Sequence, residues 1–365
     1  MSDLNTKSDF LPWPPLENLH IYQTNQCHQK CGHCWVKADS KCQDSLSAKI
    51  AKSAIIEALP LGLRRLKISG GEPLLNRSET LEILLHAHDY GLKTKIETNA
   101  IVCDTNLAVS FRNMNVTVTT SLDGATAKTH DSLRNTSESF NITLNNINKL
   151  VSNDVIVEIV SSIYSCNAHE MESIVWLCER LGVTNLKFNF PSLYGRALTL
   201  KKDALCTSQS ILNHIKKIEN IFFGKIRMEI KFDIPRAFLS KPDAGPRCSI
   251  LNLLSILPDK RYSICGIGIT LKKLTFGIAG RDQLDQIWKT NKTLLKMRQT
   301  IPNSGRGICG QCTEYQSCFG HCISYGISKF GSLNGPHPFC HEAFKQNLFP
   351  ISKLKSNEHI FTHTQ

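Results

Sequence analysis

The sequence lacks the features that mark membrane, secreted and nucleic-acid-binding proteins. It has no run of about 18 apolar residues, so we expect no membrane partner. Residues 1–15 contain no apolar segment after a positive start, so no signal peptide is evident. No dense Lys/Arg tract with interleaved aromatics occurs, which argues against a nucleic-acid partner. The sequence therefore predicts a cytoplasmic location, where thiols stay reduced.

Cysteine is too scarce for a disulfide scaffold, yet it is strongly clustered. The chain has 15 cysteines in 365 residues, below the ~8–10% of disulfide-stapled domains. Seven of the 15 lie between Cys248 and Cys340, and three more lie together near the N-terminus. Clustered cysteines in a reducing compartment indicate metal binding or catalysis.

The charge balance is basic, with 43 Lys and Arg against 31 Asp and Glu, for a formal net charge of +12. The simplest interpretation is solubility. A sharper one is a basic face that docks an acidic electron donor, such as flavodoxin or ferredoxin, or an acidic peptide segment.

The early cysteines Cys27, Cys31 and Cys34 have the spacing C-x3-C-x2-C and follow the alternating run 19–22, which reads as a strand. Three thiolates in one loop can hold three irons of a four-iron, four-sulfur (4Fe-4S) cluster and leave the fourth iron open. A zinc site stays possible at this point, because His28 and His33 lie in the same stretch.

This spacing resembles the signature of the radical S-adenosylmethionine (SAM) superfamily. The resemblance implies that the open iron binds SAM, which is reductively cleaved to a 5'-deoxyadenosyl radical that abstracts a hydrogen from the substrate. The stretch Gly70-Gly71-Glu72-Pro73 is similar to the family's GGEP motif. By the same resemblance, further SAM contacts are expected from residues near strand ends, namely Asn99, Ser121, Arg134 and Asn167.

Strand and helix patterns alternate through the first 200 residues. After the first strand, apolar runs predict strands at 66–69, 93–98, 116–121, 155–163 and 186–190. Helices are expected over 44–59, 79–90 and 138–151, after Asp104, and from a cap at Asn167. Six strand–helix units in a row predict an α/β fold with a parallel sheet, a partial (β/α)6 barrel as in the resembled family.

We expect five segments along the chain. They are an extended lead-in (1–18), a radical SAM core (19–200), a connector with helix 208–222 and strand 226–232 (201–243), a cysteine-rich domain (244–346) and a tail (347–365). The chain shows no leader-binding domain of its own before the core, so a separate leader-recognition protein is an expected partner.

The second cysteine block resembles the SPASM domain, a C-terminal extension of radical SAM enzymes that modify peptides. Its pattern implies two auxiliary 4Fe-4S clusters. The outer one would be held by Cys309, Cys312, Cys318 and Cys340, and the inner one by Cys248, Cys265 and Cys322.

The inner set is one thiolate short, since Leu254 stands where some relatives have a cysteine. A substrate thiol, water or another ligand would complete it. Two departures from the family pattern are Lys260, where a glycine is expected, and Gly266, where sulfatase-maturating enzymes carry an aspartate.

Five cysteines remain, of which Cys103 and Cys166 follow strand ends and are candidate hydrogen-atom donors or simple bystanders. The resemblance favours a ribosomally made peptide as substrate, with a thioether or C–C crosslink or an epimerised residue as product. The alternatives are a radical dehydrogenase or epimerase of a sugar or aminocyclitol, and a non-catalytic zinc-binding interaction protein.

Overall fold

The computed structural model describes residues 13–191, 195–240 and 249–355. One ten-stranded sheet runs through this part, in the order β10-β9-β8-β1-β2-β3-β4-β5-β6-β7. The strands are β1 (Asn18–Thr24), β2 (Arg65–Gly70), β3 (Lys93–Glu97), β4 (Thr117–Ser121), β5 (Val157–Ser162), β6 (Asn185–Asn189), β7 (Glu229–Asp233), β8 (Leu253–Ile256), β9 (Arg261–Ser263) and β10 (Thr275–Ile278).

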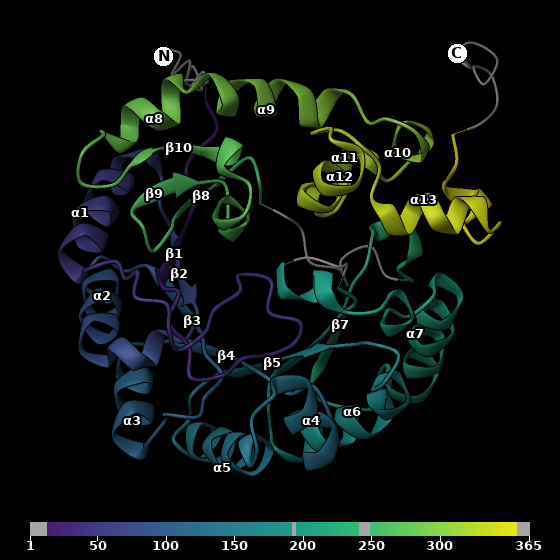
Figure 1. Ribbon diagram of the computed structural model, residues 1–365, viewed down its shortest axis with the longest axis horizontal. Coiled ribbons are helices and arrows are strands. Elements are labelled where there is room, and N and C mark those ends of the chain that lie inside the picture. The colour runs from purple at the N-terminus through teal and green to yellow at the C-terminus, as the bar shows by residue number, and fades with distance from the viewer. Residues whose placement is uncertain (1–12, 192–194, 241–248, 356–365) are drawn as a thin grey trace, which may run out of the picture.

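Helices follow the strands and cover one face of the sheet. In Figure 1 they form an outer ring that runs from α1 through α2, α3, α5, α4 and α6 to α7, with the strands inside it. These helices are α1 (Ala48–Ala58), α2 (Arg77–Asp89), α3 (Thr105–Asn113), α4 (Ala127–Arg134), α5 (Ser139–Ser152), α6 (Met171–Arg180) and α7 (Ser208–Phe222).

The C-terminal part closes the open side of this ring at the top of Figure 1. It is built from short helices: α8 (Leu284–Thr290), α9 (Lys292–Asn303), α10 (Ile308–Gln311), α11 (Tyr315–Cys318), α12 (Ile323–Phe330) and α13 (Pro338–Lys345). No helix within the described ranges is both long enough and apolar enough to cross a membrane.

Alternation along each strand decides which side chains meet the helices. In β1, Leu19 and Ile21 are completely buried and belong to the main hydrophobic core, which also contains Ala51, Ala54 and Ile55 of α1. Successive strand residues point to opposite faces, so the residues between these apolar ones face the inside of the curved sheet. The inside is polar, and this is the face that forms the site described below.

The predicted α/β class and the six parallel strands β1–β6 are confirmed, but the sheet is larger than predicted. The connector adds β7, which pairs with β6 in parallel register from Asn185↔Glu229 to Asn189↔Asp233. At the other edge, β8 pairs in parallel with β1 from Asn18↔Leu253 to Ile21↔Ile256. The boundary between the connector and the cysteine-rich domain, expected at 243/244, stays a prediction. Strands from both sides of this boundary belong to the same sheet.

Candidate active site

The loop after β1 carries the first cysteines and rests directly on the turn after β2. The Gly71 amide donates to Thr24 O at 2.5 Å, and the Glu72 amide donates to Gln26 O at 2.8 Å. A Cβ on Gly71 would lie 2.1 Å from Gln26 O, and one on Gly70, whose φ is +140°, would lie 2.4 Å from Thr24 O. The two glycines are therefore required by backbone packing against the end of β1 and the cysteine loop.

The Glu72 carboxylate ties the ends of two strands together. It accepts hydrogen bonds from Leu74 N (3.0 Å), Thr98 Oγ1 (2.6 Å) and Asn99 N (2.8 Å). The side chain is fully buried, and this burial raises the pKa of its carboxyl. Neither Glu72 nor Pro73 lines the cavity described next, and the hydrogen bonds of Glu72 hold the ends of β2 and β3 together behind it.

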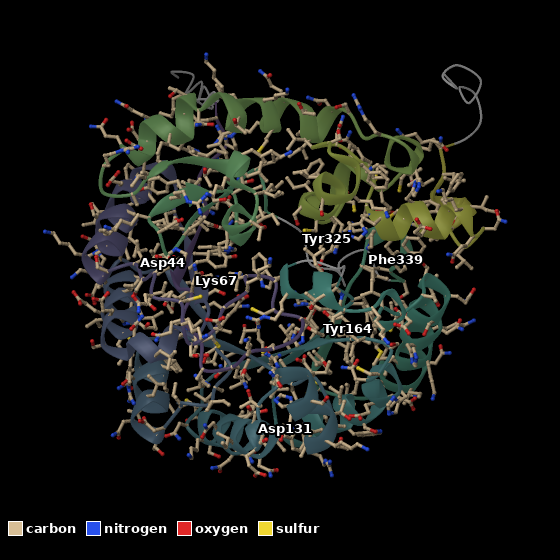
Figure 2. All side chains as sticks on the ribbon, viewed as in Figure 1. Asp44, Lys67, Asp131, Tyr164, Tyr325 and Phe339 are labelled. Atoms are coloured by element: carbon tan, nitrogen blue, oxygen red, sulfur yellow. The ribbon has the colours of Figure 1, made fainter. Side chains whose placement is uncertain are left out.

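A cavity of about 430 Å³ opens inside the curved sheet. Figure 2 shows three of its lining residues around the middle of the molecule: Lys67 of β2, Tyr164 after β5 and Tyr325 of α12. Many of the predicted site residues line it, from both halves of the chain: Cys27, Cys31, Cys34, Gly70, Gly71, Asn99, Ser121, Arg134, Cys265 and Cys322.

Arg134 reaches this cavity from the last turn of α4 and is held by a buried network. Its Nη2 lies 2.6 Å from Asp123 Oδ2, and its Nη1 donates to Cys31 Sγ at 3.8 Å. His33 Nε2 lies 3.4 Å from the same Asp123 oxygen. Burial alone would raise the pKa of Asp123, but Arg134 and His33 outweigh it and lower that pKa. Burial lowers the pKa of His33 to about 4, so this imidazole is neutral near pH 7.

Asn167, Cys103 and Cys166 also lie away from the cavity. Asn167 is buried, donates to Asp123 O (2.7 Å) and Ser162 O (2.9 Å), and accepts from Tyr164 N (2.7 Å). Its amide therefore joins the loop after β4 to the segment at the end of β5, and it makes no side-chain cap to the following helix. Cys103 belongs to the main hydrophobic core, and Cys166 is exposed to solvent. Since neither thiol lines the cavity, their proposed role as hydrogen donors gains no support from their positions.

The later cysteines separate into two groups. Cys265 and Cys322 line the main cavity, and Cys248 lies outside the described residues. The four thiols expected to hold the outer cluster, Cys309, Cys312, Cys318 and Cys340, line a second, small pocket with Tyr315 and Phe349. The fold thus gathers the four thiols that the resemblance assigns to the outer cluster and two of the three that it assigns to the inner one, and their role as cluster ligands stays a prediction.

The residues present fit iron–sulfur clusters and a polar cofactor. Three thiols from one loop line the cavity, and polar atoms with no protein partner lie in its lining residues, namely His33 Nδ1, Tyr164 Oη and Asn189 Oδ1. Buried polar atoms need partners, so a polar ligand would satisfy them.

Arg196 is a residue of the site to which the sequence assigned no role. Its guanidinium donates to Cys31 O at 2.7 Å and to Ala38 O at 2.6 Å, and its own amide donates to Cys34 O at 2.9 Å. The preceding Gly195 packs against the Trp35 backbone so closely that an added Cβ would lie 2.3 Å from Trp35 O. A Gly-Arg pair a few residues after the predicted strand 186–190 was the available signal.

Comparison with known proteins agrees with this arrangement. The sequence profile of the radical SAM superfamily matches residues 21–174. An AdoMet-dependent heme synthase from Methanosarcina barkeri is 31% identical, over 87% of this chain and 94% of its own. Mycofactocin maturase MftC from Mycobacterium tuberculosis is 25% identical, over 87% and 81%. The crystal structure of Streptococcus suis SuiB bound to S-adenosylmethionine superposes with a TM-score of 0.72 at 16% identity, covering 90% of this chain and 77% of SuiB.

The chain belongs to the radical SAM superfamily. It is therefore a SAM-dependent iron–sulfur enzyme with a cysteine-rich C-terminal region of the SPASM type, as the sequence predicted, and not a non-catalytic zinc module. The assignment of Cys27, Cys31 and Cys34 as ligands of the SAM-binding cluster stays a prediction. The roles of the individual SAM-contacting residues stay predictions.

Proposed function

We propose that this enzyme modifies a ribosomally synthesised peptide, introducing a crosslink or an epimerised residue. The observation that carries the proposal is that one cavity is bordered by Cys27, Cys31 and Cys34 and also by Cys265 and Cys322. A substrate held there would lie between two sets of cluster ligands. The relatives named mycofactocin maturase and PqqA peptide cyclase, similar over most of this chain, support a peptide in this position.

Different residues of the chain would bind the cluster and SAM. The early cysteines would hold the 4Fe-4S cluster, and Gly71, Asn99, Ser121 and Arg134 would bind SAM beside it. When bound, these groups supply the one-electron chemistry that removes a hydrogen atom from an unactivated carbon. Arg134 offers a guanidinium that suits the SAM carboxylate, and its ion pair with Asp123 fixes its orientation.

The C-terminal cysteines would hold two auxiliary clusters, with Cys309, Cys312, Cys318 and Cys340 on the outer one. Cys248, Cys265 and Cys322 would hold the inner one. An acidic flavodoxin or ferredoxin would deliver the electrons to this basic protein, whose formal charge is +12. A separate protein would recognise the leader of the peptide.

The test is incubation of the anaerobically reconstituted enzyme with SAM, reductant and the short peptides encoded next to its gene. Loss of two hydrogen atoms by mass spectrometry indicates a crosslink or oxidation. Deuterium uptake from heavy water, with no other change of mass, indicates epimerisation. A peptide left unchanged under conditions where SAM is cleaved contradicts the proposal.

A tetrapyrrole is the second candidate substrate. Three relatives that are similar over 87% of this chain are named for heme or Fe-coproporphyrin III synthesis, and one of them is 31% identical. Conversion of iron coproporphyrin III by the purified enzyme, with no change in any peptide, would favour this candidate.

A further inference from the structure

The charged residues that line the cavity are mostly cationic. Of the described lining residues, Lys67, Arg134 and Lys187 carry positive charge, and Glu97 is the one carboxylate. The five lining cysteines add negative charge when they hold clusters, so a site for an anion depends on which cation still lacks a close partner.

Two of the three cations already have close carboxylate partners. Lys67 Nζ lies 3.0 Å from Glu97 Oε1, and both residues line the cavity. This pair therefore presents one positive and one negative charge to a ligand. Arg134 lies 2.6 Å from the buried carboxylate of Asp123 and also donates to Cys31 Sγ. Arg134 is moreover the residue that we assign to the carboxylate of SAM.

Lys187 differs from both. Its Nζ lies 3.5 Å from Asp233 Oδ2, at the outer limit of a hydrogen bond. Asp233 is not among the lining residues and is shared, because its Oδ1 lies 2.9 Å from His321 Nε2. An ammonium group has three donors, so Lys187 presents unused hydrogen-bonding capacity to the cavity.

Two other polar side chains that line the cavity have atoms without partners. Asn189 follows Lys187 by two residues on β6 and therefore points to the same face. Its Oδ1 is buried without a partner, as is the hydroxyl of Tyr164, which is only 2% exposed and lines the cavity. A hydroxyl without an acceptor and an ammonium group with unused donors line the same cavity, and both are suited to an anionic oxygen.

We propose that Lys187 binds a carboxylate of the substrate, with Tyr164 as a second donor that lines the same cavity. This inference rests on the proposed function, because it assigns the substrate to the part of the cavity that SAM leaves free. The carboxylate belongs to an acidic side chain or the C-terminus of a peptide, or to a propionate of a tetrapyrrole, and the experiment below separates these sources.

The chain offers matched variants for the test. Lys187→Met removes the ammonium group and keeps most of the side-chain length, and Lys187→Arg keeps the positive charge. Lys95→Met is the control, because Lys95 Nζ lies 2.6 Å from Glu158 Oε2 on the same sheet but outside the cavity lining. Thermal unfolding and iron content of each variant establish that it is folded and loaded.

The readout is equilibrium binding to the holoenzyme with SAM present. Each ligand is compared with its neutral counterpart: the candidate precursor peptide with its fully amidated form, and iron coproporphyrin III with its methyl ester. We expect the wild type and Lys95→Met to prefer one of the two acids over its neutral form by roughly tenfold or more. Lys187→Met should lose that preference, and Lys187→Arg should keep most of it.

The inference is wrong if Lys187→Met keeps the wild-type preference, or if the wild type binds neither acid better than its neutral form. The proposed function is judged separately, by product formation from the wild type. A preference for the porphyrin acid that depends on Lys187, with no peptide product, would uphold carboxylate binding and reject the peptide as substrate.

Discussion

Replacing Gly71 by alanine tests whether the turn after β2 holds the cysteine loop in place. The new Cβ would lie 2.1 Å from Gln26 O and 2.7 Å from Gln26 C, and both atoms belong to backbone that cannot rotate away. Relief requires the loop to move from the turn, which weakens the bonds from the Gly71 and Glu72 amides to Thr24 O and Gln26 O. Overpacking of this kind costs up to ~3 kcal/mol, and each weakened bond costs about 1 kcal/mol.

We therefore expect Gly71→Ala to lower the free energy of unfolding by about 3–5 kcal/mol and to reduce iron binding by the first cluster motif. Chemical denaturation of the metal-free protein measures the first effect, and iron analysis after anaerobic reconstitution measures the second. Gly32→Ala is the matched control in the same loop, because its nearest neighbour, Leu200 Cδ2, is 4.0 Å from the added Cβ. Equal stability and equal iron content for the two variants would refute this account of the glycine.

Three further predictions follow from contacts described above. Arg196→Ala should lower the free energy of unfolding by about 2 kcal/mol, because it leaves the carbonyls of Cys31 and Ala38 without their charged donor. Amide hydrogen exchange should become faster in residues 31–38, and unchanged exchange there would contradict the role of Arg196 in holding the cysteine loop. Cys309→Ala should lower the iron content by about four per chain, whereas Cys178→Ala, in the buried core of α6, should not; equal iron in both would argue against the outer cluster. Burial opposes ionisation of Glu97, but Lys67 and Ser69 lower its pKa to about 2 from 4.5. The ionised Glu97 therefore stabilises the folded protein fully above pH 4.5, and this contribution is lost as the pH falls toward 2. Because 39% of this side chain is accessible, we expect Glu97→Gln to cost only about 1 kcal/mol at pH 6 and to approach the wild type by pH 2–3 in urea unfolding; a constant difference would contradict this linkage.

The regular alternation of the first 190 residues made the fold predictable, because each strand and each helix leaves its own period in the sequence. The edges of the sheet could not be predicted in this way. The run 253–256 reads as a short apolar strand, but nothing in it indicates that it pairs with β1, from which it is far removed along the chain. The helix α4 was missed as well, although Thr126 caps it by accepting from Thr129 N.

The site was predicted better in its residue types than in their orientations. The motifs identified which segments meet at the cavity, yet they could not indicate that Glu72 turns back toward Thr98 and Asn99. That orientation depends on the neighbouring strand. The polar interior had a signal that went unused: Lys67 and Lys187 stand inside strands whose neighbours are apolar, where a parallel sheet buried on both faces would be hydrophobic throughout.

The pairing of β8 with β1 has a consequence for synthesis on the ribosome. Asn18 emerges early, but its partner Asn252 follows only 234 residues later. At a synthesis rate of ~5–20 residues per second, the edge of β1 that pairs with β8 stays unpaired for roughly 10–50 s. During that interval Leu19 and Ile21 border an uncovered edge, which is a template for pairing with other nascent chains. Cells that make this protein in quantity should therefore need holding chaperones until translation is nearly finished.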